Sequence, residues 1–281
     1  MRNIYYIDVF TEKLGFGNPV AVILNADDLD TQTMQRIAAW TNLSETTFIC
    51  APKNGDADYE LRIFTPKNEL PFAGHPTIGS CFAAIESGLV EPKNNKIIQE
   101  CKVGLVEINV GETIEFALPK AQFSEFTNEE TQNLSGLLNQ EIIGSPQIVN
   151  VGPKWIIAQL ANAAKVHECK PDFAKMKIFE QAKGATGVTI FGKYEDSEDF
   201  IEVRSYAPSD GIDEDPVCGS GNGSVCAYML ENKLIAPNFS YKARQGRAIN
   251  RDGQIFARID QNSQIFIGGK CTIGVVGTLE I

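Results

Sequence analysis

The two halves of the chain repeat each other, and this repeat limits the folds it can adopt. Residues 44–62 and 186–204 are separated by a constant offset of 142 positions, which places LRIFTP on VRSYAP. After three extra residues the offset becomes 145, and GHPTIGSCFAAI lies on GSGNGSVCAYML. No short solenoid period is present. Two copies with the same order of strand, helix and loop predict two similar halves, and we expect their equivalent loops to meet in one cleft.

Composition predicts a folded chain outside the membrane. With 281 residues, 43% of them hydrophobic, the chain can bury a large core as one big domain or as two of ordinary size. No apolar run reaches the roughly 18 to 20 residues of a membrane helix, and the opening MRNIYYIDVF lacks the segments of a signal peptide. We therefore expect a soluble, cytoplasmic protein without a membrane partner.

Charge and cysteine usage exclude other classes. The formal net charge of -11 would repel a phosphate backbone, so nucleic acid is not expected as a partner. The seven cysteines form an odd set without a Cys-x-x-Cys pair, as expected of reduced thiols rather than disulfides or a zinc site. His75 and His167 are the only two histidines, which leaves few ways to build a metal site or a nucleophile activated by histidine.

The pattern along the chain predicts mixed strands and helices. We expect a helix from Asp30 or Thr31 through Trp40 and a second helix that Gly88 ends. Three strands with glycine turns follow over residues 96–119, which is typical of an antiparallel meander. In the second half FAKMKIFEQAK predicts a helix in which Met176 corresponds to Met34.

Both central helices begin in glycine-rich sequence, AGHPTIG at 73–79 and CGSGNGS at 218–224. Glycine allows a ligand close to the backbone, and the free N–H groups of a first helical turn attract an anion. The alternative is that these glycines only permit close helix packing. Two such loops in equivalent positions favour a site for a carboxylate substrate. Neither loop has the spacing of a P-loop or a dinucleotide fingerprint.

Glu45 breaks the repeat. It lies in NLSETTFI, where a helix gives way to a strand, and its counterpart at the 142 offset is Gly187. A carboxylate in one half only is what a single proton-transfer group requires. From position alone, a solvated loop carboxylate or a helix cap is the favoured interpretation.

Three further residues near the glycine loops are candidates. Asp215, in GIDEDPVCGSG, could orient His75 or share a proton with it, because a carboxylate fixes the tautomer of a histidine. Cys218 at a helix start is expected to have a lowered pKa and to be reactive. Four other charges are interpreted as strand-face or loop charges, with the arginine also considered as a partner of a substrate carboxylate: Glu202, Arg204, Asp213 and Glu214.

Ordered motif blocks make the sequence similar to the PhzF family. They are DVFTEKLGFGNPVAVIL, NLSETTFI, RIFTPKNELPFAGHPTIGS, RSYAPSDGIDEDPVCGSGNG and QGRAINRDG, and they run from about residue 7 to 253. The resemblance implies an α+β fold like that of diaminopimelate epimerase, with two pseudo-symmetric halves, each a mostly antiparallel curved sheet or open barrel around a central helix. We expect residues 1–120 with 265–281 in the N-terminal half, and 121–264 in the C-terminal half. It also implies a homodimer that uses no metal or organic cofactor.

The resemblance implies specific roles as well. Glu45 matches a glutamate that moves a proton between ring carbons of a dihydro-hydroxyanthranilate, and the catalytic set includes His75 and Asp215. Substrate-binding positions are implied for Ser44, Gly74, Cys218, Gly219, Ser220 and Gly221. Related amino-acid epimerases use two cysteines, and Ala73 and Cys218 stand at those positions here. The phenazine-pathway enzyme has threonine where this chain has Cys218, which leaves the substrate open.

The function predicted is therefore isomerisation of a small cyclic or amino-acid-like carboxylate with Glu45 as the acid/base group. One alternative is an amino-acid racemase or epimerase that uses Glu45 and Cys218 as two bases. Another is a non-catalytic dimer that binds a small molecule.

Overall fold

The computed structural model describes residues 1–195, 197 and 199–281. By its contacts the chain divides into two compact units, Met1–Ala117 with Gly268–Ile281 (the first unit) and Leu118–Ile267 (the second unit). No helix among the described residues has the length and apolar character needed to cross a membrane.

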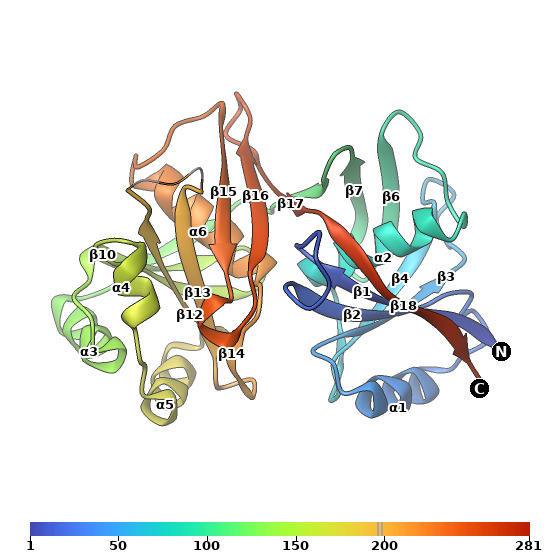
Figure 1. Ribbon diagram of the computed structural model, residues 1–281, viewed down its shortest axis with the longest axis horizontal. Helices are drawn as coiled ribbons and strands as arrows, with labels where there is room; N and C mark the ends of the chain where they lie inside the picture. The colour runs from blue at the N-terminus through green and yellow to red at the C-terminus, as the bar shows by residue number, and fades with distance from the viewer. Residues whose placement is uncertain (196, 198) are drawn as a thin grey trace. The chain divides into compact units, whose positions relative to one another are not determined.

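The first unit is a mostly antiparallel sheet that contacts a helix on its inner face (Figure 1). Its strands pair in the order β18–β1–β2–β3–β4, where only β2 and β3 run parallel, and β4 then pairs with β6 in parallel, followed by β7 and β8. The last strand of the chain thus pairs with the first, with Tyr5 opposite Val276. The elements are β1 Arg2–Val9, β2 Asn18–Ile23, α1 Thr31–Thr41, β3 Thr46–Cys50, β4 Tyr59–Phe64, β5 Glu69–Leu70, α2 Gly74–Glu86, β6 Lys96–Cys101, β7 Gly104–Val110, β8 Ile114–Ala117 and β18 Cys271–Leu279.

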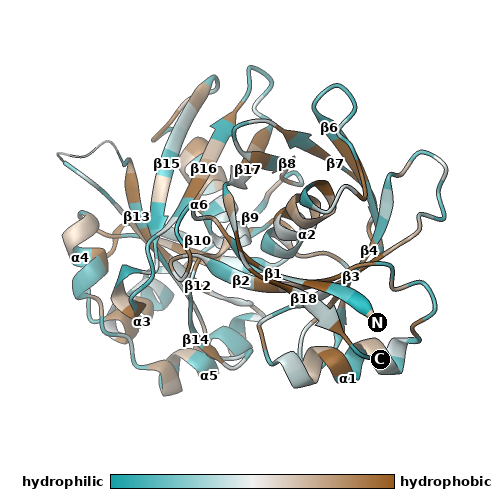
Figure 2. Cartoon of the chain, turned by 45° about the vertical axis from the view of Figure 1, so that its right-hand side comes forward, coloured by the Kyte–Doolittle hydropathy of each residue, from teal (hydrophilic) through white to brown (hydrophobic). Residues whose placement is uncertain are grey.

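Helix α2 is the central helix of the first unit. It contacts β1, β2, β3, β4, β8 and β18, and its hydrophobic residues appear brown in Figure 2. Gly79 lets it approach the sheet, because a Cβ at this position would lie 2.5 Å from Cγ1 of Val20. The helix begins at Gly74, and Gly88 follows its end with φ of +73°. The predicted helix is confirmed, with a start earlier than its hydrophobic pattern indicated.

Helix α1 forms where the sequence predicts it. The side chain of Asp30 accepts a hydrogen bond from the N–H of Thr33, and Asn42 ends the helix in the left-handed conformation. Met34 and Ala38 are its buried residues, and they pack in a core cluster with strand residues such as Phe48. A capped start and a left-handed end thus fix where this helix begins and ends.

The second unit repeats this arrangement around α6. Its strands pair in the order β9–β10–β11–β12–β13, where only β11 and β12 run parallel, and β13 then pairs with β15 in parallel, followed by β16. Helix α6 contacts β10, β11, β12 and β16 (Figure 1). The elements are β9 Gln122–Glu125, α3 Asn128–Leu138, β10 Ile143–Asn150, β11 Lys154–Gln159, α4 Ala163–Glu168, α5 Phe173–Lys183, β12 Gly187–Lys193, β13 Ile201–Ala207, β14 Ile212–Asp215, α6 Gly219–Glu231, β15 Phe239–Gln245, the 3-10 turn Arg247–Ile249 and β16 Gly253–Ile259. Strand β17, Ile265–Gly269, begins in the second unit, and its last two residues are assigned to the first.

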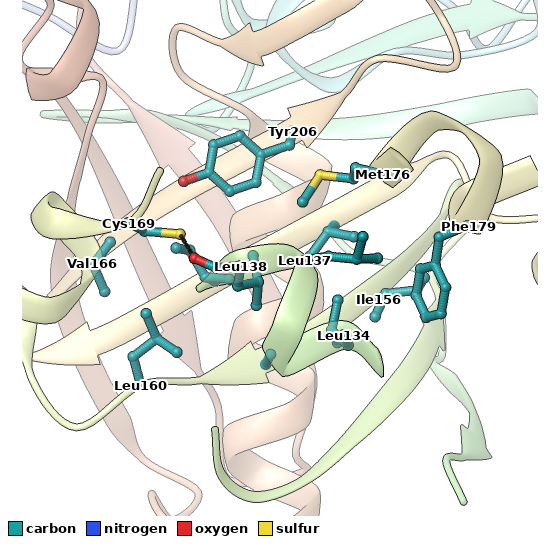
Figure 3. Packing of buried hydrophobic residues seen from close by; sticks show 13 residues of the cluster. Leu134, Leu137, Leu138, Ile156, Leu160, Val166, Cys169, Met176, Phe179 and Tyr206 are labelled. Atoms are coloured by element: carbon teal, nitrogen blue, oxygen red, sulfur yellow. Dashed lines mark hydrogen bonds between the residues drawn. The ribbon is translucent and has the colours of Figure 1, made fainter. Parts of the chain in front are cut away.

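The core of the second unit lies under α3, α4 and α5 (Figure 3). Met176 packs there with Tyr206, and the thiol of Cys169 donates to the carbonyl of Leu138 over 3.2 Å. Met176 is the counterpart of Met34, so the two methionines occupy corresponding places in two separate cores. The predicted repeat and the α+β class with two pseudo-symmetric halves are confirmed.

The repeat extends to an ion pair in each unit. Arg62 donates two hydrogen bonds to Glu69, at 2.8 and 2.9 Å, and Arg204 donates two to Glu214, at 3.0 and 2.7 Å. Arg204 and Glu214 lie on strands β13 and β14, as interpreted, but both side chains are buried, with less than a tenth of each exposed. Glu202 is also completely buried. The guanidinium of Arg204 is committed to Glu214 and to carbonyls at the end of α4, which argues against a role as partner of a substrate carboxylate.

Candidate active site

Glu45 is held between the end of α1 and the start of β3. Asn42 turns the chain out of the helix, and the hydroxyl groups of Thr41 and Thr46 hydrogen bond to each other at 2.6 Å across the segment. Leu43 packs against the core cluster of the first unit. This short, anchored connection fixes the backbone of Glu45, so its carboxyl group has a defined position.

The carboxyl group of Glu45 lies next to the imidazole of His75. Oε2 of Glu45 is 3.4 Å from Nε2 of His75, and the side chains are 16% and 8% exposed. Burial raises the pKa of Glu45 to about 7, and the hydroxyl of the neighbouring Ser44 acts in the opposite direction. A carboxyl group with a pKa near neutrality can both accept and release a proton at physiological pH.

His75 is the second residue of α2. Ala73, at the N-cap of the helix, supplies no side-chain hydrogen bond to the first turn. Gly74 packs closely on β8, since a Cβ there would be 3.1 Å from Cζ of Phe116. Close packing therefore accounts for this glycine without a ligand, which was one of the two interpretations open from the sequence.

Gly187 occupies in the second unit the place that Glu45 has in the first. A Cβ at Gly187 would lie 2.0 Å from the carbonyl oxygen of Tyr206 and 2.7 Å from the ring of Trp155. These distances leave no room for any side chain. The asymmetry seen in the sequence thus has a steric cause in the second unit.

The start of α6 carries a cluster of sulfur, hydroxyl and indole groups. Cys218 is the N-cap residue, and its Sγ accepts a hydrogen bond from the N–H of Gly221 at 3.2 Å. Ser220 Oγ accepts a hydrogen bond from Nε1 of Trp155 at 2.9 Å and lies 3.6 Å from Sγ of Cys218. Because the indole N–H can only donate, the hydroxyl of Ser220 keeps its own proton to donate elsewhere.

Gly219 and Gly221 are buried residues of the first turn of α6. A Cβ at Gly221 would lie 2.6 Å from Oγ of Ser205 and 2.8 Å from Oγ1 of Thr189. Packing of the helix onto strands therefore favours glycine more strongly here than at Gly74, where the nearest atom would be 3.1 Å away. Binding of a ligand by these backbone groups stays a prediction.

Asp215 ends β14, where it lies opposite Ser205 of β13. Its Oδ1 accepts a hydrogen bond from the N–H of Val217 at 3.0 Å, and its carbonyl accepts one from Nε2 of Gln245 at 2.9 Å. Asp215 therefore belongs to the second unit and His75 to the first. Their pairing stays a prediction, whereas the contact of His75 with Glu45 lies within one unit.

The predicted residues thus form two groups, one in each unit. Ser44, Glu45, Gly74 and His75 are in the first group, and Asp215 and 218–221 are in the second. Within residues 1–195, 197 and 199–281 no three His, Cys, Asp or Glu side chains are grouped as they would be around a metal ion. Glu45 and His75 form a titratable pair, an arrangement suited to proton transfer.

Trp155 and Gln245 were not among the residues predicted from the sequence, although both contact the segment around the start of α6. Trp155 donates to Ser220, and Gln245 bonds to the segment between Asp215 and α6. A signal existed for Gln245, because alternate residues of its strand, Tyr241 and Ala243, are typical of an inward face. A glutamine in register with them is a buried polar group that needs partners.

The two units and their central helices define an α+β protein of the diaminopimelate epimerase-like class. A family model described as phenazine biosynthesis-like protein matches residues 7–277, and the chain belongs to this PhzC-PhzF family. The family resemblance seen in the sequence is confirmed.

Individual relatives cover nearly the whole chain. Antisense-enhancing sequence 1 of Schizosaccharomyces pombe is 44% identical over 96% of each chain. The trans-2,3-dihydro-3-hydroxyanthranilate isomerase of Pseudomonas aeruginosa is 30% identical over 92% of this chain and 91% of its own. The crystal structure of a Bacillus anthracis PhzF-family protein superimposes with a TM-score of 0.87 at 26% identity, covering 100% of this chain and 99% of that one. The chain is an isomerase of the PhzF type.

Proposed function

We propose that Glu45 is the acid/base group of this isomerase and that it moves a proton from one carbon of a small carboxylate to another. The observation that carries the proposal is the position of the Glu45 carboxyl group, 3.4 Å from His75 and with a pKa of about 7. Its counterpart Gly187 has no side chain, so the repeat supplies one such group rather than two.

The chemistry follows from the carboxylate form of Glu45. The carboxylate takes a proton from a carbon next to an activating group, and the electron pair left behind shifts along the substrate. The carboxylic acid then returns the proton to a second carbon, which regenerates the carboxylate. His75 orients the carboxyl group through Oε2, and no cofactor is needed because no electron leaves the substrate.

The second unit contributes the groups that bind the substrate in this proposal. The Ser220 hydroxyl, held by Trp155, can donate to a carboxylate oxygen, and backbone groups at 219–221 add the positive end of α6. We propose that this group and Glu45 face one cleft between the units, with Ser44, Gly74, His75, Asp215 and Cys218 along it.

The substrate is a small cyclic or amino-acid-like carboxylate. Because one relative is named for its action on trans-2,3-dihydro-3-hydroxyanthranilate, this compound is the first probe. It carries a carboxylate for the helix end and ring carbons between which a proton can move. Other carboxylates are then tested by hydrogen exchange with deuterated water.

The test is the variant Glu45→Gln, which keeps the shape of the side chain and removes the base. We expect a loss of kcat/KM of roughly 10²- to 10⁴-fold, together with loss of deuterium uptake from solvent. Glu12→Gln, at a side chain 69% exposed, is the control and should keep full activity. Full activity of Glu45→Gln on the true substrate would reject the assignment.

The pH profile of the wild-type enzyme gives a second measurement. The base must be ionised to accept a proton, so kcat/KM should rise with pH through about 7, where Glu45 titrates. A profile that is flat between pH 5.5 and 8.5 would contradict the role of Glu45 as base.

A second candidate is epimerisation with Glu45 and Cys218 as two bases. It is favoured by the position of the Cys218 thiol at the start of α6, where Ala73 is its counterpart in α2. Two bases on opposite faces would introduce deuterium during inversion at one carbon. Cys218→Ala then separates the candidates, since it should abolish epimerisation, whereas proton transfer by Glu45 should remain detectable at a lowered rate.

We also propose that the enzyme acts as a homodimer in the cytoplasm. All seven cysteines are free thiols, which fits a reducing compartment. The mass of the particle in solution, measured by light scattering, tests the dimer. A monomer at micromolar concentration would contradict it.

A further inference from the structure

Gln245 is a buried side chain that joins three parts of the second unit. It is 1% exposed and ends β15. Its Oε1 accepts hydrogen bonds from the N–H of Cys218 at 3.2 Å and from Nδ2 of Asn222 at 2.7 Å. Its Nε2 donates to the carbonyl of Asp215 at 2.9 Å. This one amide group is thus hydrogen bonded to three places: the last residue of β14, the N-cap of α6 and the first turn of α6.

Only a group that both donates and accepts can make this set of bonds. The side-chain carbonyl serves two donors, and the NH₂ group serves the backbone acceptor. An apolar side chain of the same length would leave the N–H of Cys218 and the carbonyl of Asp215 without these partners. A carboxylate would keep the acceptor and lose the donor.

The backbone around Gln245 holds the same segment by a second, independent contact. Gly246 has φ of +97°, and a Cβ there would lie 2.5 Å from the carbonyl oxygen of Pro216. A Cβ at Gly253 of β16 would lie 2.2 Å from Cγ2 of Val217. Two glycines therefore let β15 and β16 close over Pro216 and Val217, and the segment 215–218 has little freedom to move.

We infer that Gln245 is a positioning residue for the proton transfer: its amide sets Asp215 and Cys218 at the start of α6. The inference rests on the proposed function, in which both residues line the site. In this proposal Gln245 does not contact the substrate, because its hydrogen bonds are made to backbone atoms of Cys218 and Asp215 and to the side chain of Asn222. A displacement of the order of 1 Å in a positioned group can lower the rate about 100-fold.

The first unit provides a control in Gln99. This residue lies on β6 two residues before the strand ends, at the position that corresponds to Ala243 of β15, and it is also completely buried. Its Nε2 donates to Oγ1 of Thr77, the counterpart of Asn222, and its Oε1 accepts from the hydroxyl of Tyr59. These bonds stay within the packing under α2. Loss of Gln99 should thus cost stability without moving a residue of the site.

The experiment compares Gln245→Met, Gln245→Glu and Gln99→Met in the full-length protein. The first measurement is amide hydrogen exchange by mass spectrometry on the peptide that contains Cys218. Gln245→Met should speed exchange there at least about 10-fold, while Gln99→Met leaves this peptide unchanged. An exchange rate in this peptide that is the same in Gln245→Met, in Gln99→Met and in the wild type would overturn the inference, whatever the substrate is.

The second measurement is turnover of trans-2,3-dihydro-3-hydroxyanthranilate at a temperature where each variant is folded. Gln245→Met should lower kcat roughly 10- to 100-fold with a smaller change in KM, and Gln99→Met should lower it by less than about threefold. Similar losses in the two methionine variants would mean a merely structural role and reject the inference.

A pH profile of Gln245→Glu separates positioning from packing. When protonated, the introduced carboxyl group both donates and accepts, as the amide does, and when ionised it cannot donate to the carbonyl of Asp215. The titratable groups on the bound segment are the Asp215 carboxyl and the Cys218 thiol. The ratio of variant to wild-type kcat/KM should therefore rise as pH falls, and taking the ratio cancels the titration of Glu45. A ratio independent of pH contradicts the role assigned to the donor.

The proposed function and the positioning role of Gln245 would fail with different experimental results. If Glu45→Gln keeps full activity while Gln245→Met still frees the amide of Cys218, proton transfer by Glu45 is wrong and the positioning of this segment stands. If Glu45→Gln is inactive and the Gln245 variants behave as wild type in exchange and turnover, the positioning is wrong and the proposed function stands.

Discussion

The central helices α2 and α6 have the same length and corresponding places, but they begin differently. α2 starts after Ala73 without a side-chain cap, and its second residue His75 faces Glu45. α6 starts after Cys218, whose thiol accepts the N–H of Gly221, and its second residue Ser220 is held by Trp155. The frame is duplicated, whereas the polar groups at the two helix starts differ.

The difference has a steric origin close to each helix. In the second unit Trp155 lies beside Gly187, while Val20 takes the corresponding place in β2. The indole fills the space that a side chain at 187 would need, and its N–H binds Ser220 instead. A large residue in one copy thus excludes the carboxyl side chain that the other copy carries at the matching position.

The largest effect is expected from the two matched ion pairs. Arg204→Met should lower the free energy of unfolding by about 3 to 5 kcal/mol, because Glu214 is left buried and charged without its partner. Arg62→Met should cost about 1 kcal/mol, since its pair is more exposed and Lys102 still reaches Glu69. Urea unfolding measures both, and equal losses would show that the two pairs do not differ in burial as described.

The buried carboxyl groups of the second unit predict a pH dependence of stability. Burial raises the pKa of Glu202 to about 7 from 4.5, so the folded state binds a proton that the unfolded state has lost. Stability should fall as pH rises from about 4.5 through 7, by at most roughly 3 kcal/mol from this group. Glu202→Gln should flatten that part of the curve.

Glu180 offers an independent version of the same measurement. It is buried on α5 where α1 has Ala38, and burial raises its pKa to about 7. Glu180→Gln should remove a second, separate part of the slope, and the double variant should show the sum of both. A slope unchanged in either single variant would contradict the burial of that carboxyl group.

Gly187→Ala tests the steric origin of the asymmetry. The added methyl group would contact the Tyr206 carbonyl and the Trp155 ring, so we expect a loss of about 1 to 3 kcal/mol in thermal or urea unfolding. Gly136→Ala in α3 is the control, because nothing lies within 4 Å of its Cβ, and it should gain about 0.5 to 1 kcal/mol. A neutral Gly187→Ala would mean that a side chain fits at position 187, so that steric exclusion does not explain the absence of a second carboxylate there.

The smallest effect is expected at the two helix starts. Cys218→Ala removes the N-cap of α6 and should cost about 1 kcal/mol, whereas Ala73→Ser adds a cap to α2 and should gain about 0.5 kcal/mol or more. Both are measured by thermal unfolding. If Ala73→Ser also lowers activity, the uncapped start of α2 serves the site, and unchanged activity would show that it does not.

Much of the fold could be predicted because local sequence patterns, such as helix caps and the spacing of hydrophobic residues, indicate it. Asp30 before α1 and the matching Asp172 before α5 are caps that any reader of the sequence can find, and Met34 and Met176 show which faces turn inward. The constant offset of 142 positions predicted from the sequence alone that these two helices correspond. Helix α3 was missed although Thr127 and Glu130 form a capping box, because its residues carry no recognised repeat partner.

The sequence by itself determined the duplicated fold, the family and the presence of a carboxylate at position 45 in one half only. These features depend on residue type and spacing, which can be read directly from the sequence. Only the tertiary structure decided that Glu45 meets His75, that Trp155 denies Gly187 a side chain, and that Gln245 ties Asp215 to α6. These contacts join residues that are far apart along the chain, 30 positions in the case of Gln245 and Asp215. Their energies depend on distance and burial, which packing sets and residue order does not record.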